Sequence, residues 1–355
     1  MLRRVVVVSA LAAGLVAVSA AHASGQKVAE PKVAEPGSAE RGQGAHWVAA
    51  EIERVVAAGL MAGSVETFRP DELLTWGELA TVLADVGGRQ ITVKDPARPV
   101  TLTQLNTQLV KALGMSSEIK TVRRALAAAR LSAPRRAAPE TVARLLRLRT
   151  DREDDARELR PGDPVTRAEA AYSIARVLSI QPWELERVRQ LIQPFSLPEL
   201  SELQRKILMR GVRVIGFPYV WGGTSVRQQA SLGGQLVPGG FDCSGLIWHV
   251  YKSKPFAGAP GLGDVLHGRS TYALSGEVGN ELRITRDAIE PADLLFFGPR
   301  GPGSSPDEVG HMGIYLGGGW MIHSSTFGAT IIPLTAWYEN RFAWARRPLA
   351  EAGLA

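Results

Sequence analysis

The 355-residue sequence contains a single cysteine, Cys243, so the chain cannot form an internal disulfide bond. Aromatic residues make up only 6% of the chain, and no basic stripe is interleaved with them, which argues against nucleic acid as a partner. Neither sign of charge dominates, since 41 Lys and Arg residues stand against 35 Asp and Glu residues. Beyond the first residues no segment is apolar enough to span a bilayer, so we expect no stable membrane insertion.

The N-terminal end differs in composition from the rest of the chain. Residues 1–23 combine two arginines, an apolar run and a small-residue Ala-x-Ala site, which is the layout of a secretory signal peptide. The run is shorter than the ~20 apolar residues of a membrane-spanning helix, which favours cleavage over an anchor. Residues 24–44 repeat Lys-Val-Ala-Glu-Pro and predict an extended linker. We therefore expect a secreted protein.

Residues 45–180 predict an all-α region with an internal repeat. The pattern Arg-Pro-x4-Thr-x2-Glu-x-Ala starts at Arg69 and returns 91 residues later at Arg160. Both copies predict a turn followed by a helix with a Thr-x-x-Glu capping motif. We expect two degenerate repeats, a connecting helix with a Pro-bounded joint at 181–199, and a second domain at 200–350.

The first copy of this repeat resembles the surface-layer homology module. A helix that starts at His46-Trp47 leads into a Phe-Arg-Pro-Asp loop and a second helix, as in that module. Trp76 and Gly77 stand where the module usually has Arg and Ala. The resemblance implies binding to secondary wall polymers. A helical spacer without a binding site is the alternative, and both remain open at this point.

In the last third of the chain, the only cysteine lies at the predicted start of a helix. Apolar residues after Cys243 recur at helical spacing, and Asp242 is of a favoured N-cap type. The free N–H groups and positive dipole end of a helix stabilise a thiolate, so we predict a lowered pKa for Cys243. A small buried structural thiol is the alternative.

Two histidines are predicted to lie side by side on a β-hairpin. Apolar arms run from His311 to His323 around three glycines, and a hairpin centred on Gly317 sets the histidines directly opposite each other. One imidazole can then fix the tautomer of the other, which becomes a general base for the thiol. A metal site built from Cys243 and both histidines lacks a fourth ligand, so we expect no metal and no other cofactor.

Six sequence blocks in this region resemble the NlpC-type cell-wall cysteine peptidases. The main blocks are FDCSGL, GHMGIYLG and MIHS, and the lesser blocks are YVWGG, RST and PADLLFF. The resemblance implies an α+β fold of papain-like type, in which the helix that carries the cysteine packs on an antiparallel sheet. It also implies hydrolysis of peptidoglycan stem peptides, between a D-γ-glutamyl residue and a diamino acid such as meso-diaminopimelate.

Carried over by position, the resemblance gives each candidate residue a role. The roles are catalytic for Cys243, His311 and His323, oxyanion-binding for Tyr219, and substrate-binding for Asp242, Ser244 and Thr271. Asp242 can also be a plain N-cap, and the two roles are compatible.

Three inserts depart from the family pattern, at 224–240, 258–264 and 300–308, and we expect them around the mouth of the cleft. An amidase or acyltransferase on the same fold is an alternative to the peptidase. A non-catalytic wall-binding scaffold is another, although an intact set of one cysteine and two histidines argues against it. Under each interpretation we expect the protein to be associated with the cell wall.

Overall fold

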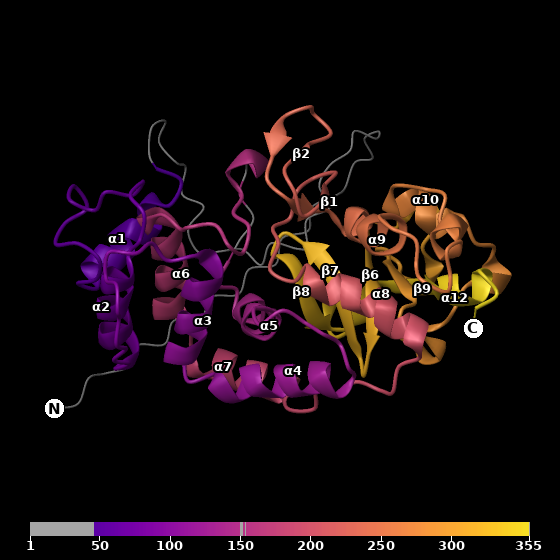
Figure 1. The fold of residues 1–355 in the computed structure, drawn as a ribbon, viewed down its shortest axis with the longest axis horizontal. Helices are drawn as coiled ribbons and strands as arrows, with labels where there is room; N and C mark the ends of the chain where they lie inside the picture. The colour runs from indigo at the N-terminus through magenta and orange to yellow at the C-terminus, as the bar shows by residue number, and fades with distance from the viewer. Residues whose placement is uncertain (1–45, 150–151, 153, 355) are drawn as a thin grey trace, which may run out of the picture.

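The computed structural model describes residues 46–149, 152 and 154–354 (Figure 1). The predicted signal peptide at 1–23 and linker at 24–44 lie outside the described residues and stay predictions. A helical part occupies one end of the molecule, and a part that contains the main sheet occupies the other. In the described ranges, no helix is both long enough and apolar enough to cross a membrane.

The N-terminal part of the described chain is helical, as predicted. Its elements are α1 (Ala49–Ala57), α2 (Trp76–Gly87), α3 (Leu102–Ala112), α4 (Ser116–Ala128), α5 (Ala137–Leu145), the 3-10 helix η1 (Asp155–Arg157), α6 (Arg167–Ser179) and α7 (Pro182–Ile192).

Three of these helices begin in the same way, whereas the sequence analysis found two such starts. The side chains of Thr75, Thr101 and Thr166 cap α2, α3 and α6, and each accepts a hydrogen bond from the backbone N–H three residues later. Each cap fixes the start of a helix by satisfying an N–H group that has no partner within the helix. The middle start was missed because glutamine replaces glutamate at its third position, although Pro-Val-Thr occurs at both 99–101 and 164–166.

The residues before the three threonines join the three starts into a closed ring. The N–H of Leu74 donates to the carbonyl of Val165, that of Val165 to Val100, and that of Val100 to Leu74, all at 2.9 Å. All three side chains are buried. The helical part is therefore organised around a three-way junction.

The C-terminal part contains a five-stranded antiparallel sheet in the order β8-β7-β6-β5-β9. The strands are β5 (Leu294–Phe297), β6 (His311–Gly317), β7 (Trp320–Ser325), β8 (Gly328–Pro333) and β9 (Phe342–Arg346). Two helices, α8 (Glu202–Arg213) and α9 (Cys243–Lys252), pack against β6 on the sheet. This arrangement confirms the predicted α+β fold with the cysteine helix on an antiparallel sheet.

Short elements make up the connections between these strands and helices. They are α10 (Thr271–Gly276), α11 (Trp337–Arg341), α12 (Pro348–Glu351), η2 (Leu262–Val265), η3 (Asn280–Leu282), η4 (Arg286–Ala288), η5 (Gly301–Gly303) and η6 (Pro306–Glu308). The insert at 224–240 folds into two small antiparallel pairs rather than a plain loop. The pairs are β1 (Thr224–Ser225) with β4 (Gly240–Phe241), and β2 (Gln229–Ala230) with β3 (Leu236–Val237).

The insert at 258–264 does not lie where the sequence analysis expected it. The Lys252 ammonium donates to the carbonyl of Gly263 at 3.1 Å, which places this insert at the C-terminal end of α9. Cys243 is the first residue of that helix. Ten helical residues rise about 15 Å, so this insert lies at the end of α9 away from Cys243 and not around the mouth of a cleft at the cysteine, as expected.

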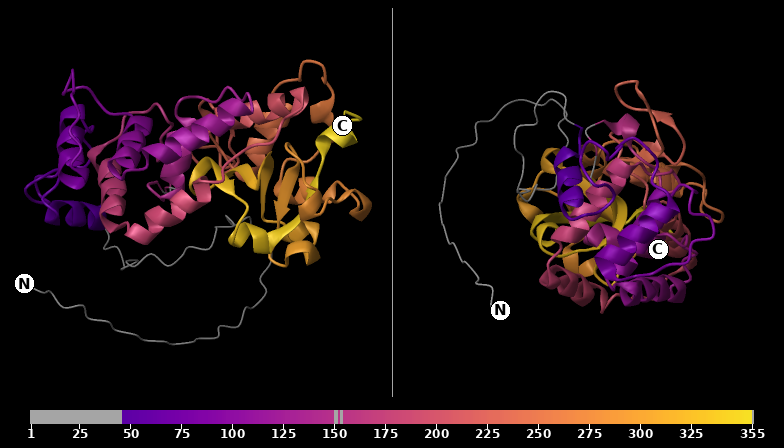
Figure 2. Two further views of the ribbon diagram at one scale, coloured as in Figure 1. Left: turned by 90° about the horizontal axis from the view of Figure 1, so that it is seen from below. Right: turned by 90° about the vertical axis from the view of Figure 1, so that its left-hand side faces the viewer.

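The helical part and the sheet share one continuous apolar core. Helix α5 packs against β8, and the two parts lie against each other in two further views (Figure 2). The buried Arg144 guanidinium donates to the carbonyls of Gly216, at 3.1 Å, and Phe327. Arg136 donates to the carbonyl of Ile215 at 2.9 Å. The boundary at 181–199 stays a prediction, but these contacts hold the helical part in a fixed position.

Candidate catalytic site

The start of α9 places Cys243 in the first turn of a helix, as predicted. The Asp242 side chain caps this helix, because its Oδ1 accepts the N–H of Gly245. A close approach of the backbone fixes the position of the turn, since a Cβ at Gly245 would lie only 1.8 Å from the carbonyl oxygen of Gly223. The cysteine is thereby held against the segment that contains Tyr219.

The predicted pKa shift of Cys243 is wrong in direction. Burial of the thiol, together with the neighbouring Asp242 carboxylate, raises its pKa to about 11. The Thr271 hydroxyl and the backbone N–H groups of Ser244 and Met312 lower it, but they do not outweigh burial. The prediction was wrong because burial removes water from the thiolate, and this raises the pKa more than the helix dipole lowers it. In the free protein the thiol is protonated at neutral pH.

The two histidines form a hydrogen-bonded pair on neighbouring strands, although the predicted register was wrong. Ile314 pairs with Ile322, so His323 lies opposite Gly313 rather than opposite His311. The strands shift register near the glycine turn, which the symmetric hairpin did not include. His311 Nε2 nevertheless lies 2.9 Å from His323 Nδ1, and the two rings are nearly perpendicular.

Gly313 makes room for this diagonal contact and was missed as a functional residue. A Cβ at this position would lie 3.3 Å from the Cβ of His323 and 2.9 Å from the Sδ of Met321. Because alternate residues share one face of a strand, Gly313 and His311 face the same side. The absent side chain lets the His323 ring reach across to His311.

Both imidazoles are held in the neutral form. Burial lowers the pKa of His311 to about 4. Burial also lowers the pKa of His323 well below its usual value, and the nearby His311 contributes to the decrease. The Tyr338 ring packs against both histidines, with ring centroids 6.0 Å from His311 and 5.4 Å from His323. Two neutral rings can share one proton, as donor and acceptor, without charge repulsion.

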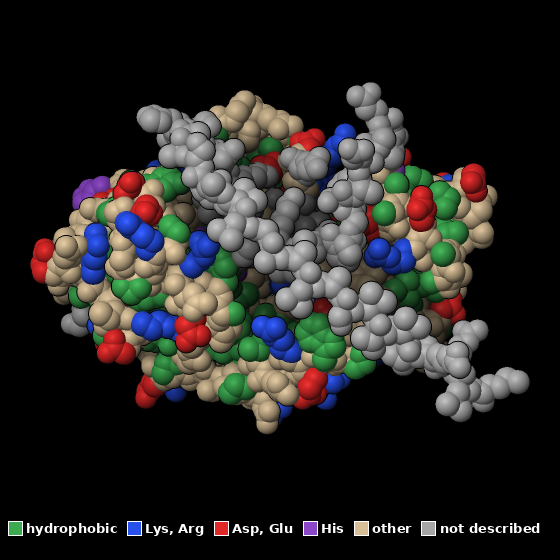
Figure 3. Space-filling model, turned by 180° about the vertical axis from the view of Figure 1, so that it is seen from behind, with side chains coloured by type: hydrophobic (Ala, Val, Ile, Leu, Met, Phe, Trp, Pro, Cys, Tyr) green, Lys and Arg blue, Asp and Glu red, His purple; other side chains and the backbone are tan. Residues whose placement is uncertain are grey.

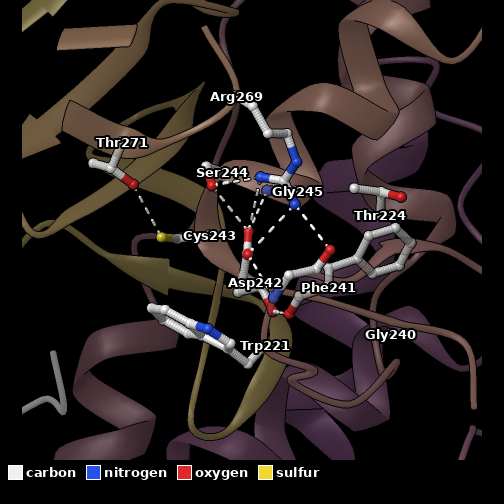
Figure 4. A network of polar contacts seen from close by, with 12 residues as sticks. Trp221, Thr224, Gly240, Phe241, Asp242, Cys243, Ser244, Gly245, Arg269 and Thr271 are labelled. Atoms are coloured by element: carbon white, nitrogen blue, oxygen red, sulfur yellow. Dashed lines mark hydrogen bonds and ion pairs between the residues drawn. The ribbon is translucent and has the colours of Figure 1, made fainter. Parts of the chain in front are cut away.

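Asp242 and Ser244 belong to a network centred on Arg269, a residue to which the sequence analysis gave no role (Figure 4). The Arg269 guanidinium donates to Ser244 Oγ at 2.7 Å and reaches the two Asp242 oxygens at 3.5 and 3.4 Å. Ser244 Oγ donates to Asp242 Oδ1 at 3.0 Å, and the N–H of Gly222 donates to Oδ2 at 2.9 Å. The network joins the cysteine helix, the Trp221-Gly222 turn and the segment before α10.

The other candidate residues lie close to the cysteine helix. Thr271 is buried at the start of α10, and its Oγ1 lies 3.3 Å from the Cys243 sulfur. The buried Tyr219 lies in a segment whose backbone pairs with Phe241, through bonds from Val220 N–H to Phe241 and from Phe241 N–H to Pro218. The oxyanion role of Tyr219 and the substrate roles of Asp242, Ser244 and Thr271 stay predictions.

One side of the site is held by the helical part of the molecule. Trp221 directly precedes Gly222, whose N–H binds Asp242, and the backbone N–H of Trp221 donates to Asp155 Oδ2 at 2.9 Å. Asp155 belongs to η1, which follows α5 in the chain. The Leu232 side chain packs over Gly222, so the 229–237 hairpin borders the same turn.

Taken together, the fold and the site define a class of protein, an α+β domain of papain-like type with a thiol helix beside a histidine pair. Residues 216–346 match the NlpC/P60 family, and residues 43–80 match the S-layer homology domain. The chain therefore carries an NlpC/P60 domain at its C-terminal end and an S-layer homology domain near its N-terminal end.

Several known proteins are similar to the C-terminal part. A probable endopeptidase of Mycobacterium tuberculosis is 30% identical over 139 residues, which are 39% of this chain but 28% of the relative. A gamma-D-glutamyl-L-lysine dipeptidyl-peptidase of Bacillus subtilis is 31% identical over 149 residues, 41% of either chain. The structure of an NlpC/P60 family protein from Bacillus cereus aligns with a TM-score of 0.32 at 28% identity, covering 44% of this chain and 43% of that one. The chain thus matches less than half of the length of each of these three relatives.

Proposed function

We propose that this protein is a peptidoglycan hydrolase, a cysteine endopeptidase that cuts the stem peptides of the cell wall. The observation that carries the proposal is the combination of one thiol at a helix N-terminus with a hydrogen-bonded histidine pair on the adjacent strands. Helix α9 packs directly on β6 and β7, the strands that bear the histidines. The three side chains have the chemical roles that a nucleophile, a base and an orienting residue require.

The hydrogen bond between the histidines determines which nitrogen serves as the base. His311 Nε2 is engaged with His323 Nδ1 at 2.9 Å, so Nδ1 of His311 is the atom left to receive the thiol proton. For that, Nε2 of His311 carries a proton and donates it to His323, as the orienting residue of a triad requires. His323 is then the tautomer protonated on Nε2.

Because the resting pair is a neutral thiol and a neutral imidazole, attack and proton transfer occur together. As the Cys243 sulfur bonds to the substrate carbonyl carbon, its proton moves to His311 Nδ1. The imidazolium then protonates the leaving amine, which departs and leaves a thioester. A water that gives its proton to His311 attacks the thioester. The carbon–sulfur bond then breaks, the acid is released, and the proton on His311 returns to the Cys243 sulfur.

Fixed dipoles around the sulfur stabilise the charge that develops during attack. The backbone N–H of Cys243 and the Tyr219 hydroxyl are the proposed donors to the oxyanion. Asp242 and Ser244 are proposed to receive the amine end of a stem peptide, and Thr271 to contact the substrate beside the sulfur. Arg269 orients Asp242 and Ser244, and its side chain is 40% exposed, so it is accessible from solvent.

The proposed bond joins a D-γ-glutamyl residue to a diamino acid. Two Bacillus relatives are named gamma-D-glutamyl-L-lysine dipeptidyl-peptidase, which supports a γ-glutamyl bond. For this chain we propose meso-diaminopimelate as the diamino acid. The S-layer homology domain supports a cell-surface location, with the predicted signal peptide directing export and the helical part contacting wall polymers.

Digestion of purified peptidoglycan and of the tripeptide L-Ala-D-γ-Glu-diaminopimelate tests this proposal. Mass spectrometry of the wild-type tripeptide digest should show L-Ala-D-Glu and free diaminopimelate, and the peptidoglycan digest should show glycan that keeps only L-Ala-D-Glu. Cys243→Ala should give none of these products. His323→Asn should retain partial activity, since an amide can still accept the His311 proton. Release of an intact stem peptide from the glycan would instead indicate an amidase. No wild-type product at any enzyme level, from a protein with normal circular dichroism, would refute the peptidase proposal.

A further inference from the structure

The helical part contains a basic pocket that neither the repeat nor the catalytic site explains. Its volume is about 530 Å³, and it opens to solvent between α3, α4 and the start of α5. Its lining consists of Arg89, Thr103, Thr107, Lys111, Ser116, Ile119, Lys120, Arg123, Arg135, Arg136 and Pro139. We refer to this set as the basic pocket. Thr103, Thr107 and Lys111 recur every four residues, so they share one face of α3.

The charges in the basic pocket are of one sign. Six of its side chains are Lys or Arg, and none of the lining residues is Asp or Glu. Within the described part of the chain, none of the six forms an ion pair with a carboxylate. Elsewhere basic and acidic side chains are interspersed, as the face in Figure 3 shows. Mutual repulsion of six unpaired cations in a concave surface favours an anionic occupant.

Two buried polar atoms of the lining also lack a partner. Arg89 Nε and Thr103 Oγ1 are inaccessible to solvent and have no hydrogen-bond partner among the described residues. Leaving such groups buried and unpaired is unfavourable, so the lining has hydrogen-bonding capacity that the described residues do not use.

The N-terminus of α4 adds further donors at the edge of the basic pocket. The 13-residue helix starts at Ser116, and its N-cap residue, Met115, makes no side-chain capping bond. The first-turn Glu118 accepts from Ser117 Oγ at 2.8 Å and is not part of the lining. The free N–H groups and positive end of a helix bind phosphate oxygens well.

We propose that the basic pocket binds the phosphate groups of a phosphodiester-linked polymer. Arginine forks, hydroxyls and helix N–H groups are the donors that phosphate oxygens prefer, since they match its tetrahedral array of acceptors. A space of 530 Å³ lined by six cations can hold more than one phosphate group. Successive units of such a polymer supply one phosphate each. A carboxylate holds its two oxygens in one plane and has no bridging ester oxygens, so a carboxylate polymer is the weaker match.

The proposal rests on the wall contact proposed above for the helical part, but not on the peptidase activity, because none of the lining residues belongs to the proposed catalytic site. It does connect the two, since Arg136 also donates to the carbonyl of Ile215, just ahead of the segment that contains Tyr219. A bound polymer would thus be anchored on the same rigid body as the site.

Binding of the full-length secreted chain to defined probes tests the proposal. The probes are inorganic tripolyphosphate, a synthetic glycerol-phosphate oligomer, polygalacturonate and vesicles that contain phosphatidylglycerol. Isothermal titration should show binding of tripolyphosphate and of the glycerol-phosphate oligomer, with affinity that falls as salt increases. Arg123→Glu in the basic pocket should weaken both by about tenfold or more.

A matched control lies one residue further along α4. Arg124 is exposed like Arg123 but does not line the basic pocket, so Arg124→Glu makes the same charge change elsewhere. This variant should bind within about threefold of wild type, and both variants should digest the tripeptide normally. Equal losses in the two variants would show general charge attraction and overturn the proposal. Preference for polygalacturonate, or binding to vesicles alone, would overturn the assigned chemistry.

Discussion

At the scale of single residues, the chemistry depends on how far burial moves the proton affinities. The thiol pKa is raised to about 11 and that of His311 is lowered to about 4, so both groups are neutral across the intervening range. The sequence could identify these groups as reactive, because their types and order are visible in the chain. It could not give the direction of the thiol shift, because packing around the sulfur determines it.

Alkylation of Cys243 should reveal the raised thiol pKa directly. Because the chain contains no second cysteine, the rate of reaction with iodoacetamide reports this thiol alone. The thiolate is the reactive form, so the rate should still be increasing above pH 9.5 in the folded protein. In urea the same thiol should titrate near its usual value of about 8.5. A folded-state midpoint below 8 would show that the helix end dominates.

The histidine pair should make the folded protein less stable in mild acid. Because both pKa values are lower in the folded chain, the unfolded chain binds more protons below about pH 6.5. Stability is therefore lost as the pH falls from 6.5 toward 4, by on the order of 3 kcal/mol for the His311 shift to about 4.

Urea unfolding of wild type and His311→Phe between pH 4 and 7.5 measures this effect. Phenylalanine fills a similar volume but cannot take up a proton, so its unfolding free energy should fall less steeply with pH. Other titrating groups are common to both proteins and cancel in the difference. Parallel curves for the two proteins would contradict the pKa shift.

At the scale of elements, the hairpin of β6 and β7 shows what the sequence could and could not predict. Its strands, its glycine turn and the meeting of His311 with His323 follow from the pattern. The register does not, because the turn is asymmetric and the strands shift near Gly317. The third capped helix start, at Thr101, was likewise missed, because Gln104 stands where the other two starts have glutamate.

Gly313→Ala should therefore reduce activity through the geometry of the hairpin. An added methyl meets the Cβ of His323 at 3.3 Å and the Sδ of Met321 at 2.9 Å, so the His323 ring must shift away from His311. We expect kcat to fall by about tenfold, because a displaced orienting residue weakens the base. Gly303→Ala, where nothing lies within 4 Å, is the matched control and should keep wild-type kcat. Equal kcat for both variants would remove Gly313 from the site.

At the scale of the whole molecule, the helical part contacts segments that border the candidate catalytic site. The hydrogen bond from Arg144 to the carbonyl of Gly216 and the continuous apolar core hold the two parts together. Asp155 of η1 accepts a hydrogen bond from the backbone N–H of Trp221. None of this was visible in the sequence, because local patterns do not show which surfaces of two regions meet. The sequence analysis treated the helical part only as an anchor or a spacer.

If η1 positions the Trp221 turn, Asp155→Ala should lower kcat/KM toward the tripeptide. Residue 155 lies far from Cys243 in the sequence. The lost carboxylate frees the N–H of Trp221, to which it is bonded at 2.9 Å, and lets that turn move. We expect a loss of about three- to tenfold, carried mainly by KM, with an unchanged thermal midpoint. Asp155→Asn keeps an acceptor oxygen and should restore most of the activity. If the helical part were only an anchor or a spacer, both variants would keep the wild-type kcat/KM. A lower kcat/KM for Asp155→Ala than for Asp155→Asn would show that η1 positions the Trp221 turn.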